Sequence, residues 1–224
     1  MECAALWDMD GTLVDTAELH FQAWQSLAAQ IGKPFTRADF SATFGRRNPE
    51  IIRALFDPNA TDSVTAELGE WKEVIYRSAA KRIGVTLLPG ARELLHNLHR
   101  SGWRQAIASS APRANLELVL ALTATRDLFQ SLVTAEDTER GKPDPQVFQI
   151  AAAKLGAPAS HCVVFEDAIA GVQAAKAAGM HCVAVRFVGH HSDEALTAAG
   201  ADRVVDSLAV IGADDVRRLL EPHD

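Results

Sequence analysis

Two aspartates stand two residues apart in the segment Asp8-Met9-Asp10-Gly11-Thr12, directly after a short apolar run. In a turn that follows a strand, carboxylates at this spacing can face one cavity, and Gly11 allows unusual backbone angles close to a ligand. Crowded carboxylates need a counter-charge, which a Mg²⁺ ion could supply while also neutralising an incoming phosphate. A solvated acidic turn is the alternative for these residues taken alone.

Other polar residues with chemical potential follow apolar runs later in the chain. Ser109 and the pair Glu166-Asp167 each come directly after such a run, and Lys142 lies in a turn bounded by proline. Taken singly, Ser109 or Asp167 could cap a helix and Lys142 could be a surface lysine. Two adjacent acids exceed what a helix cap needs, so the acidic pair favours a functional site.

Apolar runs alternate with helical patterns over most of the chain, which predicts an α/β fold with a parallel sheet. The expected strands are residues 3–7, 105–108, 132–135, 162–165, 182–187 and 203–205. Two of these runs, at 162–165 and from 182 onwards, are continuously apolar, as is typical of strands covered on both faces. Ligands bind at the carboxyl ends of strands in such sheets, where the polar residues above are expected to lie.

One stretch breaks this alternation. No strand is expected from about residue 15 to residue 85, where helical patterns cover residues 18–30, 48–56 and 65–83. The β/α alternation resumes near residues 87–90. The sequence therefore predicts a core domain of residues 1–14 and 86–224, interrupted by a small all-helical domain of residues 15–85.

The composition is that of a folded soluble protein, with 48% hydrophobic and 23% charged residues among 224. The net charge of −7 gives no long-range attraction for nucleic acid or anionic lipid, so neither is an expected partner. Cys3, Cys162 and Cys182 lack C-x-x-C spacing, which favours buried thiols in a reducing cytoplasm. The pattern indicates neither a membrane span nor a signal peptide, and it leaves the oligomeric state open, a monomer included.

Residues 8–15, with the sequence DMDGTLVD, resemble the first motif of the haloacid dehalogenase (HAD) superfamily, which consists chiefly of phosphatases and phosphomutases. Ser109, Lys142 and the pair Glu166-Asp167 match the later motifs of that family in order and in strand context. The match spans nearly the whole sheet domain. The resemblance implies the HAD fold: a Rossmann-like parallel sheet core with a helical cap domain that closes over the catalytic cleft.

The resemblance also implies a chemical role for three of these residues. Asp8 would be the nucleophile, because a carboxylate can accept a phosphoryl group as an acyl phosphate. Asp10 would act as general acid and then as general base. Lys142 would stabilise charge on the transferring phosphoryl group and offset nearby carboxylates.

The remaining motif residues would bind metal and phosphate. By resemblance, Mg²⁺ would be held by the Asp8 carboxylate, the backbone carbonyl of Asp10, and Asp167 with Glu166. The side chain of Ser109 and the backbone N–H of the following residue, Ser110, would hold phosphate oxygens.

Four cap residues are candidates for substrate contact. Thr16 and His20 lie in a segment that resembles the β-phosphoglucomutase-like branch of the family, and His20 could contact Asp10 or substrate. Arg46 and Arg47 follow a glycine, and either could bind a phosphate or carboxylate through two hydrogen bonds. The alternatives are a partly buried histidine and a solvated loop.

These features predict a Mg²⁺-dependent phosphatase acting on a small phosphorylated metabolite, with a sugar phosphate as the expected substrate. The alternative is a β-phosphoglucomutase, an isomerase that uses the same aspartyl phosphate but must grip a second phosphate. Ala111 and Pro112 lack the polar side chains expected for that grip, which would have to be rebuilt around Arg113, Asn115 and the cap arginines.

Two other functions are less well matched. A non-enzymatic phospho-acceptor module needs roughly 100 to 150 residues and no helical insertion, and it would have little use for Asp10. A metal-free dehalogenase would not require a second acid at Asp10.

Overall fold

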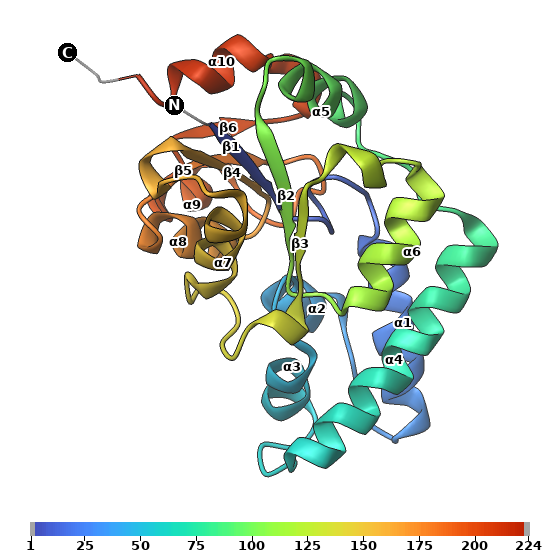
Figure 1. Ribbon diagram of the computed structural model, residues 1–224. Helices are drawn as coiled ribbons and strands as arrows, with labels where there is room; N and C mark the ends of the chain where they lie inside the picture. Colours follow the sequence, from blue (N-terminus) through green and yellow to red (C-terminus); the bar gives the residue numbers. More distant parts are fainter. Residues whose placement is uncertain (1–2, 222–224) are drawn as a thin grey trace.

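Six parallel strands form one sheet in the order β3-β2-β1-β4-β5-β6 (Figure 1). This computed structural model describes residues 3–221, so residues 1–2 and 222–224 of the predicted core domain lie outside the described range. The strands are β1 (Ala4–Trp7), β2 (Arg104–Ala108), β3 (Ser131–Val133), β4 (Cys162–Glu166), β5 (His181–Val185) and β6 (Arg203–Val205). The predicted α/β class and the parallel sheet are confirmed.

The strand register aligns the positions that carry chemistry. Trp7 pairs with Ile107 of β2 on one side and with Phe165 of β4 on the other. The next residue, Asp8, continues the pairing by donating its backbone N–H to the carbonyl of Phe165 at 2.9 Å. Asp8 and Glu166 therefore stand side by side at the carboxyl edge of the sheet.

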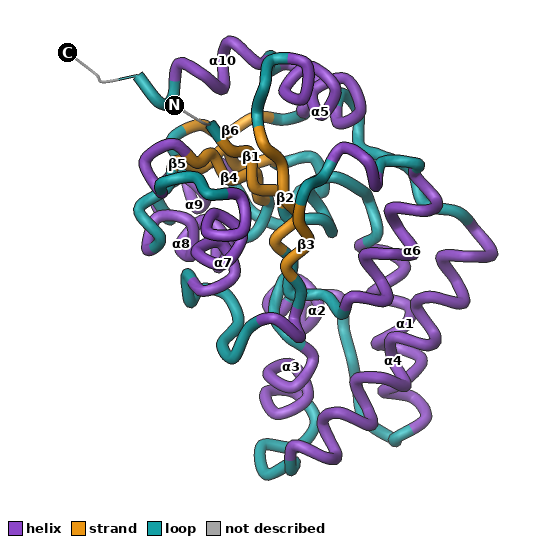
Figure 2. The backbone as a smooth tube through the Cα atoms, in the orientation of Figure 1, coloured by secondary structure: helices purple, strands orange, loops and turns teal. Residues whose placement is uncertain are grey.

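Helices cover both faces of the sheet (Figures 1 and 2). One face packs against α5 (Ala91–Arg100), α6 (Arg113–Thr123) and α10 (Ala213–Arg218), and the other against α7 (Gln146–Leu155), α8 (Ile169–Ala177) and α9 (Asp193–Ala198). Strands β1 and β4 are buried along their whole length because both faces are covered, which agrees with their continuously apolar sequences. Within residues 3–221, no helix is long and apolar enough to cross a membrane.

The residues between β1 and α5 form four helices and no strand within the described chain. They are α1 (Ala17–Gln30), α2 (Arg37–Thr43), α3 (Asn48–Leu55) and α4 (Asp62–Ile83). Aromatic side chains on α1 to α3 and their loops build a separate core around Phe21, Trp24 and Phe56. We call this helical segment the cap; its exact limits, residues 15–85, stay a prediction.

The chain enters and leaves the cap at adjacent points. Val14 forms an antiparallel bridge with Leu87, and the backbone N–H of Leu88 donates to the carbonyl of Leu13 at 2.8 Å. The two connections between cap and sheet thus form one paired stem.

Some predicted elements differ from the structure for local reasons. Periodicity missed α2, which has seven residues and is initiated by a capping box between Thr36 and Asp39. The strand expected to reach residue 135 ends at Val133, because Thr134 and Asp137 form a second capping box that starts a 3₁₀ turn.

Candidate active site

Lys142 lies between two carboxylates at the carboxyl edge of the sheet. Its ammonium donates to Asp8 Oδ1 at 2.5 Å and to Glu166 Oε1 at 2.6 Å, and all three side chains are buried. Attraction to Asp8 and Glu166 outweighs burial and raises the pKa of Lys142 above its ordinary value. The three predicted residues, brought from three distant segments, therefore form one charged cluster.

Glu166 and Asp167 have different surroundings although they are adjacent. Oε1 of Glu166 accepts from Lys142, and Oε2 accepts the backbone N–H groups of Asp167 and Ala168 at 2.7 Å each. Asp167 accepts a longer hydrogen bond from Thr12 Oγ1, at 3.3 Å, and does not cap α8. Asp167 therefore has carboxylate oxygen capacity to spare, whereas Glu166 is held on both oxygens.

Gly11 makes room for Asp167. Its φ of +91° favours glycine, and a Cβ at this position would lie 2.2 Å from Asp167 Oδ2. The sequence analysis predicted unusual backbone angles at this glycine, and the positive φ agrees with that expectation.

The crowded carboxyl groups resist ionisation. Burial raises the pKa of Asp8 to about 7; Glu166 adds repulsion and the Lys142 ammonium opposes the shift. Burial, together with the charges of Glu166 and Asp8, also raises the pKa of Asp167 well above its ordinary value. Lys142 supplies one positive charge to three carboxyl groups, so the cluster is short of positive charge.

Gly171 on α8 is expected to tolerate no side chain. A Cβ there would lie 1.7 Å from Glu166 Oε1, the oxygen that contacts Lys142. We expect Gly171→Ala to lower the free energy of unfolding by about 3 kcal/mol, because the displaced carboxylate outweighs the roughly 1 kcal/mol that alanine adds in a helix. Gly69→Ala on α4, where the nearest atom is 3.3 Å away, is the control, and urea unfolding of both variants is the measurement. An unchanged midpoint for Gly171→Ala would contradict the expected displacement.

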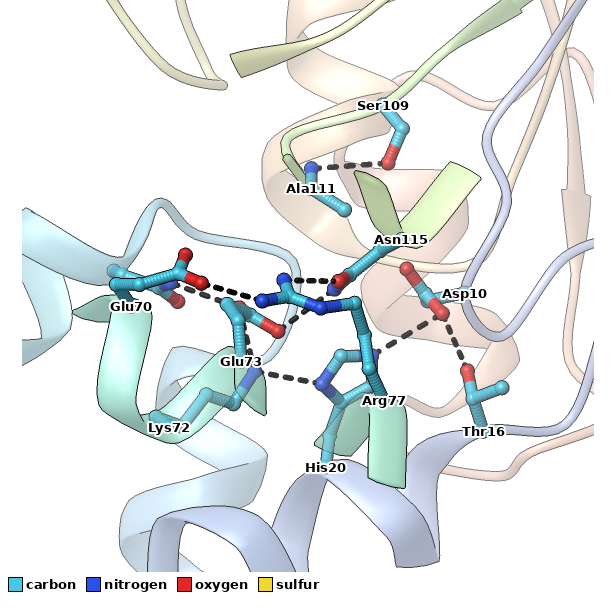
Figure 3. Close-up of polar contacts among 11 residues, drawn as sticks. Asp10, Thr16, His20, Glu70, Lys72, Glu73, Arg77, Ser109, Ala111 and Asn115 are labelled. Carbon is cyan, nitrogen blue, oxygen red and sulfur yellow. Dashed lines mark hydrogen bonds and ion pairs between the residues drawn. The ribbon is translucent and has the colours of Figure 1, made fainter. Parts of the chain in front are cut away.

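Asp10 is turned toward the cap (Figure 3). Its Oδ1 accepts from Thr16 Oγ1 at 2.5 Å and lies 3.2 Å from His20 Nε2. Burial opposes ionisation of Asp10, yet His20 and Thr16 together lower its pKa below the ordinary value. The structure thus brings Thr16 and His20, two of the four cap residues singled out in the sequence, into contact with the predicted acid-base group.

A lysine on α4 orients the histidine. Lys72 Nζ lies 2.7 Å from His20 Nδ1, so Nδ1 of the ring faces the lysine while Nε2 faces Asp10. Lys72 also donates to Glu73 Oε1 at 2.9 Å (Figure 3). Sequence reasoning missed Lys72 and Glu73. The sequence signal that could have found them is their position in the helix. Both charged residues lie on the buried face of α4, whose other buried residues are Thr65, Gly69, Tyr76 and Ala80.

Glu73 is satisfied by donors from three elements. Besides Lys72, Asn48 Nδ2 donates at 2.8 Å and Asn115 Nδ2 donates at 2.7 Å. Burial alone would raise the pKa of Glu73, but Lys72, His20 and the two amides outweigh it and lower the pKa to about 2. This carboxylate therefore joins cap helices to α6 of the sheet domain.

The depressed pKa of Glu73 predicts an acid-sensitive contribution to stability. A carboxyl whose folded pKa lies below its unfolded value stabilises the fold above about pH 4.5, and this contribution is lost as the pH falls toward 2. We expect Glu73→Gln to be less stable than the parent by roughly 3 kcal/mol at pH 7, with the gap shrinking between pH 5 and pH 3. Urea unfolding at several pH values measures this gap. A constant gap would contradict the assignment, and Glu70→Gln, on the exposed side of α4, is the control.

A pocket lies between the sheet and the cap. It encloses about 60 Å³ and is bounded by Asp8, Asp10, Ser109 and Ser110 from the sheet domain, and by cap residues that include Arg46. Such a volume holds only a few water molecules, so we expect the cap to move away from the sheet when a substrate enters. Ser109 Oγ accepts the backbone N–H of Ala111 at 3.1 Å, which turns the chain around the pocket wall (Figure 3).

The two adjacent cap arginines point to different places. Arg46 is exposed at the pocket, and its guanidinium has no hydrogen bond or ion pair in the described part of the chain. Arg47 instead donates to the backbone carbonyls of Glu139 and Ala135 in the sheet domain. Of the two candidates for substrate contact, the structure therefore brings Arg46 to the pocket.

No three His, Cys, Asp or Glu side chains among residues 3–221 are grouped so as to hold a metal ion by themselves. A metal site can also be built from two carboxylates and a backbone carbonyl, and such a site has fewer than three of these side chains. Asp8, Asp167 and the carbonyl of Asp10 are such a set of oxygen donors.

The family model described as haloacid dehalogenase-like hydrolase matches residues 4–179, which include Asp8, Ser109, Lys142 and Asp167. The chain belongs to this family. The HAD resemblance found in the sequence is thereby confirmed.

Relatives of this HAD-like hydrolase include phosphatases and a phosphomutase. It is 34% identical to validoxylamine A 7'-phosphate phosphatase of Streptomyces hygroscopicus subsp. limoneus, covering 87% of this chain and 90% of that protein. It is 32% identical to hexitol phosphatase B of Escherichia coli K12 (95% and 96% covered) and 34% identical to beta-phosphoglucomutase of Bacillus subtilis (81% and 82%). It is also 34% identical to the protein SUPPRESSOR OF QUENCHING 1 of Arabidopsis thaliana, over 95% of this chain but only 20% of that longer protein.

A solved structure supports the same branch. Beta-phosphoglucomutase from Clostridium difficile superposes with a TM-score of 0.87 at 25% identity, covering 98% of this chain and 97% of that one. This HAD-like hydrolase is thus an enzyme of the phosphohydrolase or phosphomutase type, with the β-phosphoglucomutase-like fold.

Proposed function

We propose that this HAD-like hydrolase is a Mg²⁺-dependent phosphatase that hydrolyses a small sugar phosphate through an aspartyl phosphate on Asp8. The observation that carries the proposal is the position of Lys142, within 2.6 Å of both Asp8 and Glu166. Its charge would stabilise a phosphoryl group transferring to Asp8. Two relatives named validoxylamine A 7'-phosphate phosphatase and hexitol phosphatase B support the substrate class.

Mg²⁺ fits the charge and donor atoms of the site. Burial, with repulsion from neighbouring carboxylates, raises the pKa values of Asp8 and Asp167, and the charge of a divalent cation would favour their ionised forms. We assign the ion to these two carboxylates and the backbone carbonyl of Asp10. Glu166 would position Lys142 and the turn at Asp167, since both its oxygens are engaged. The bound ion would neutralise phosphate oxygens.

In the first half-reaction, a carboxylate oxygen of Asp8 forms a bond to phosphorus while the bond from phosphorus to the leaving oxygen breaks. Asp10, in its protonated form, gives its proton to that oxygen, so the product leaves as a neutral hydroxyl. Ser109 and the backbone N–H of Ser110 hold phosphate oxygens, and Lys142 offsets their charge.

In the second half-reaction, Asp10 takes a proton from water, and the water oxygen attacks phosphorus. The bond from phosphorus to Asp8 breaks, which releases phosphate and restores the Asp8 carboxylate. The contacts of Asp10 with Thr16 and His20 favour its ionised form, which is the form required of a base at this stage.

Three polar side chains near the pocket are already engaged in contacts within the protein, and this favours hydrolysis over mutase chemistry. Arg47 binds backbone carbonyls, Arg113 binds Asp137 at 2.8 Å, and Asn115 binds Glu73. A mutase would need these same groups to bind the second phosphate of its intermediate. Arg46 remains available to contact the distal part of the substrate, and this favours the mutase as the second candidate.

A substrate screen separates the two functions. Phosphate release is measured over hexose, pentose and hexitol phosphates with Mg²⁺, beside the conversion of β-glucose 1-phosphate in the presence of a bisphosphate primer. Free phosphate, lost in excess EDTA and restored by Mg²⁺, supports the phosphatase. Glucose 6-phosphate without net phosphate release supports the mutase, and undiminished activity in EDTA would contradict the metal assignment.

The proposal also places the enzyme in the cytoplasm, without nucleic acid or membrane partners. The three cysteines are free, and Cys162 and Cys182 are buried thiols, which supports a reducing compartment.

A further inference from the structure

Arg47 connects the cap to the sheet domain. It lies at the start of α3 in extended backbone conformation, and unlike Arg46 it is not among the residues that line the pocket. Nη1 donates to the carbonyl of Glu139 at 2.9 Å, and Nη2 donates to the carbonyl of Ala135 at 3.0 Å. The planar guanidinium thus spans two turns of one segment, 88 to 92 residues further along the chain.

The segment held by Arg47 is the one that carries Lys142. It runs from the end of β3 to the start of α7, and Gly141 immediately precedes the lysine. A Cβ at Gly141 would lie 2.7 Å from Arg47 Cδ and 2.6 Å from Glu50 Oε1. Cap side chains therefore pack directly on the residue next to Lys142.

We propose that Arg47 is a positioning residue that couples the closed position of the cap to the placement of Lys142. With the cap closed, Arg47 and Glu50 press residues 135–141 into the conformation that sets the ammonium between Asp8 and Glu166. When the cap moves away, both hydrogen bonds and this contact are lost together. The inference rests on the proposed phosphatase function for its kinetic consequence, although its structural part does not depend on it.

The segment also has anchors of its own, so removal of Arg47 should loosen it without unfolding it. Gln146 Oε1 accepts the backbone N–H groups of Glu139 and Arg140, and Arg140 pairs with Asp144 at 2.8 Å. These contacts lie within the sheet domain and persist in an open cap. Arg47 adds a further restraint on residues 135–141, and this restraint exists only when the cap is closed.

Kinetics and amide hydrogen exchange of Arg47→Ala, Arg47→Lys and Arg53→Ala test the proposal. Arg53 lies on the same helix and donates to Ala60 and Asp62, both within the cap, so its variant is the matched control. With p-nitrophenyl phosphate and Mg²⁺, Arg47→Ala should lower kcat about tenfold or more with KM changed less than about threefold, because a displaced Lys142 hurts the chemical step. Amides of residues 135–142 should exchange faster in this variant, whereas Arg53→Ala should match the parent in both measurements.

Arg47→Lys should recover part of the protection and part of the rate, since an ammonium reaches one carbonyl but not both in a fixed plane. A kcat for Arg47→Ala within twofold of the parent would overturn the coupling. So would a lower kcat with unchanged exchange at residues 135–142, because Arg47 would then act on substrate directly. If the parent hydrolyses no phosphate ester, the proposed function fails, while the exchange comparison still decides whether Arg47 restrains the segment.

Discussion

Asp8→Asn is expected to abolish phosphoryl transfer and to leave the protein folded. An amide cannot form the acyl phosphate, so turnover should fall on the order of 10⁴-fold or more, and no labelled phosphoenzyme should be trapped by acid quench. The fold should survive because burial disfavours the charged form of Asp8, which raises its pKa to about 7, and asparagine keeps the shape of the side chain without the charge. Asn Oδ1 can also still accept from Lys142. Phosphate release and thermal unfolding measure the two effects.

The control for this variant is Asp15→Asn. Asp15 belongs to the same motif but is exposed, and it should retain parental activity and stability. Activity of Asp8→Asn within tenfold of the parent would remove Asp8 as the nucleophile. Loss of activity accompanied by unfolding would instead show that the charge of Asp8 is needed for the fold.

Lys142→Met should lower both activity and stability. Without the ammonium, kcat is expected to fall about 10³-fold, as for removal of a group aimed at transition-state charge. The free energy of unfolding should fall by about 3 kcal/mol, because Glu166 and Asp8 remain buried at the carboxyl edge without their cation. Lys154→Met, whose ammonium pairs with Asp137 at the surface, should change stability by less than about 1 kcal/mol.

A double variant separates the two effects of Lys142. Lys142→Met combined with Glu166→Gln removes one of the stranded charges, so it should recover stability relative to Lys142→Met alone without recovering activity. Denaturant unfolding and kinetics of the parent, both single variants and the double variant complete the cycle. Additive losses of stability would contradict the direct contact between Lys142 and Glu166.

The strands and the carboxylates of the charged cluster could be predicted because their signals are local. Each strand is a short apolar run, and parallel register then brings Asp8 and Glu166 together at one edge. Lys142 needed the family resemblance, since a lysine in a proline-bounded turn is ordinary by itself. The contacts of Arg47 and Glu73 could not be predicted, because their partners lie on other elements and depend on how the cap packs on the sheet domain.

The paired stem at Val14 and Leu87 has an evolutionary consequence. The two connections of the cap meet at adjacent backbone positions. The sheet domain therefore needs only a short gap to be closed between them, whatever the length of the inserted segment. A different set of helices could be grafted onto this stem without altering the strand order beneath. Relatives could then diversify in the compounds they accept while the phosphoryl chemistry beneath stays the same.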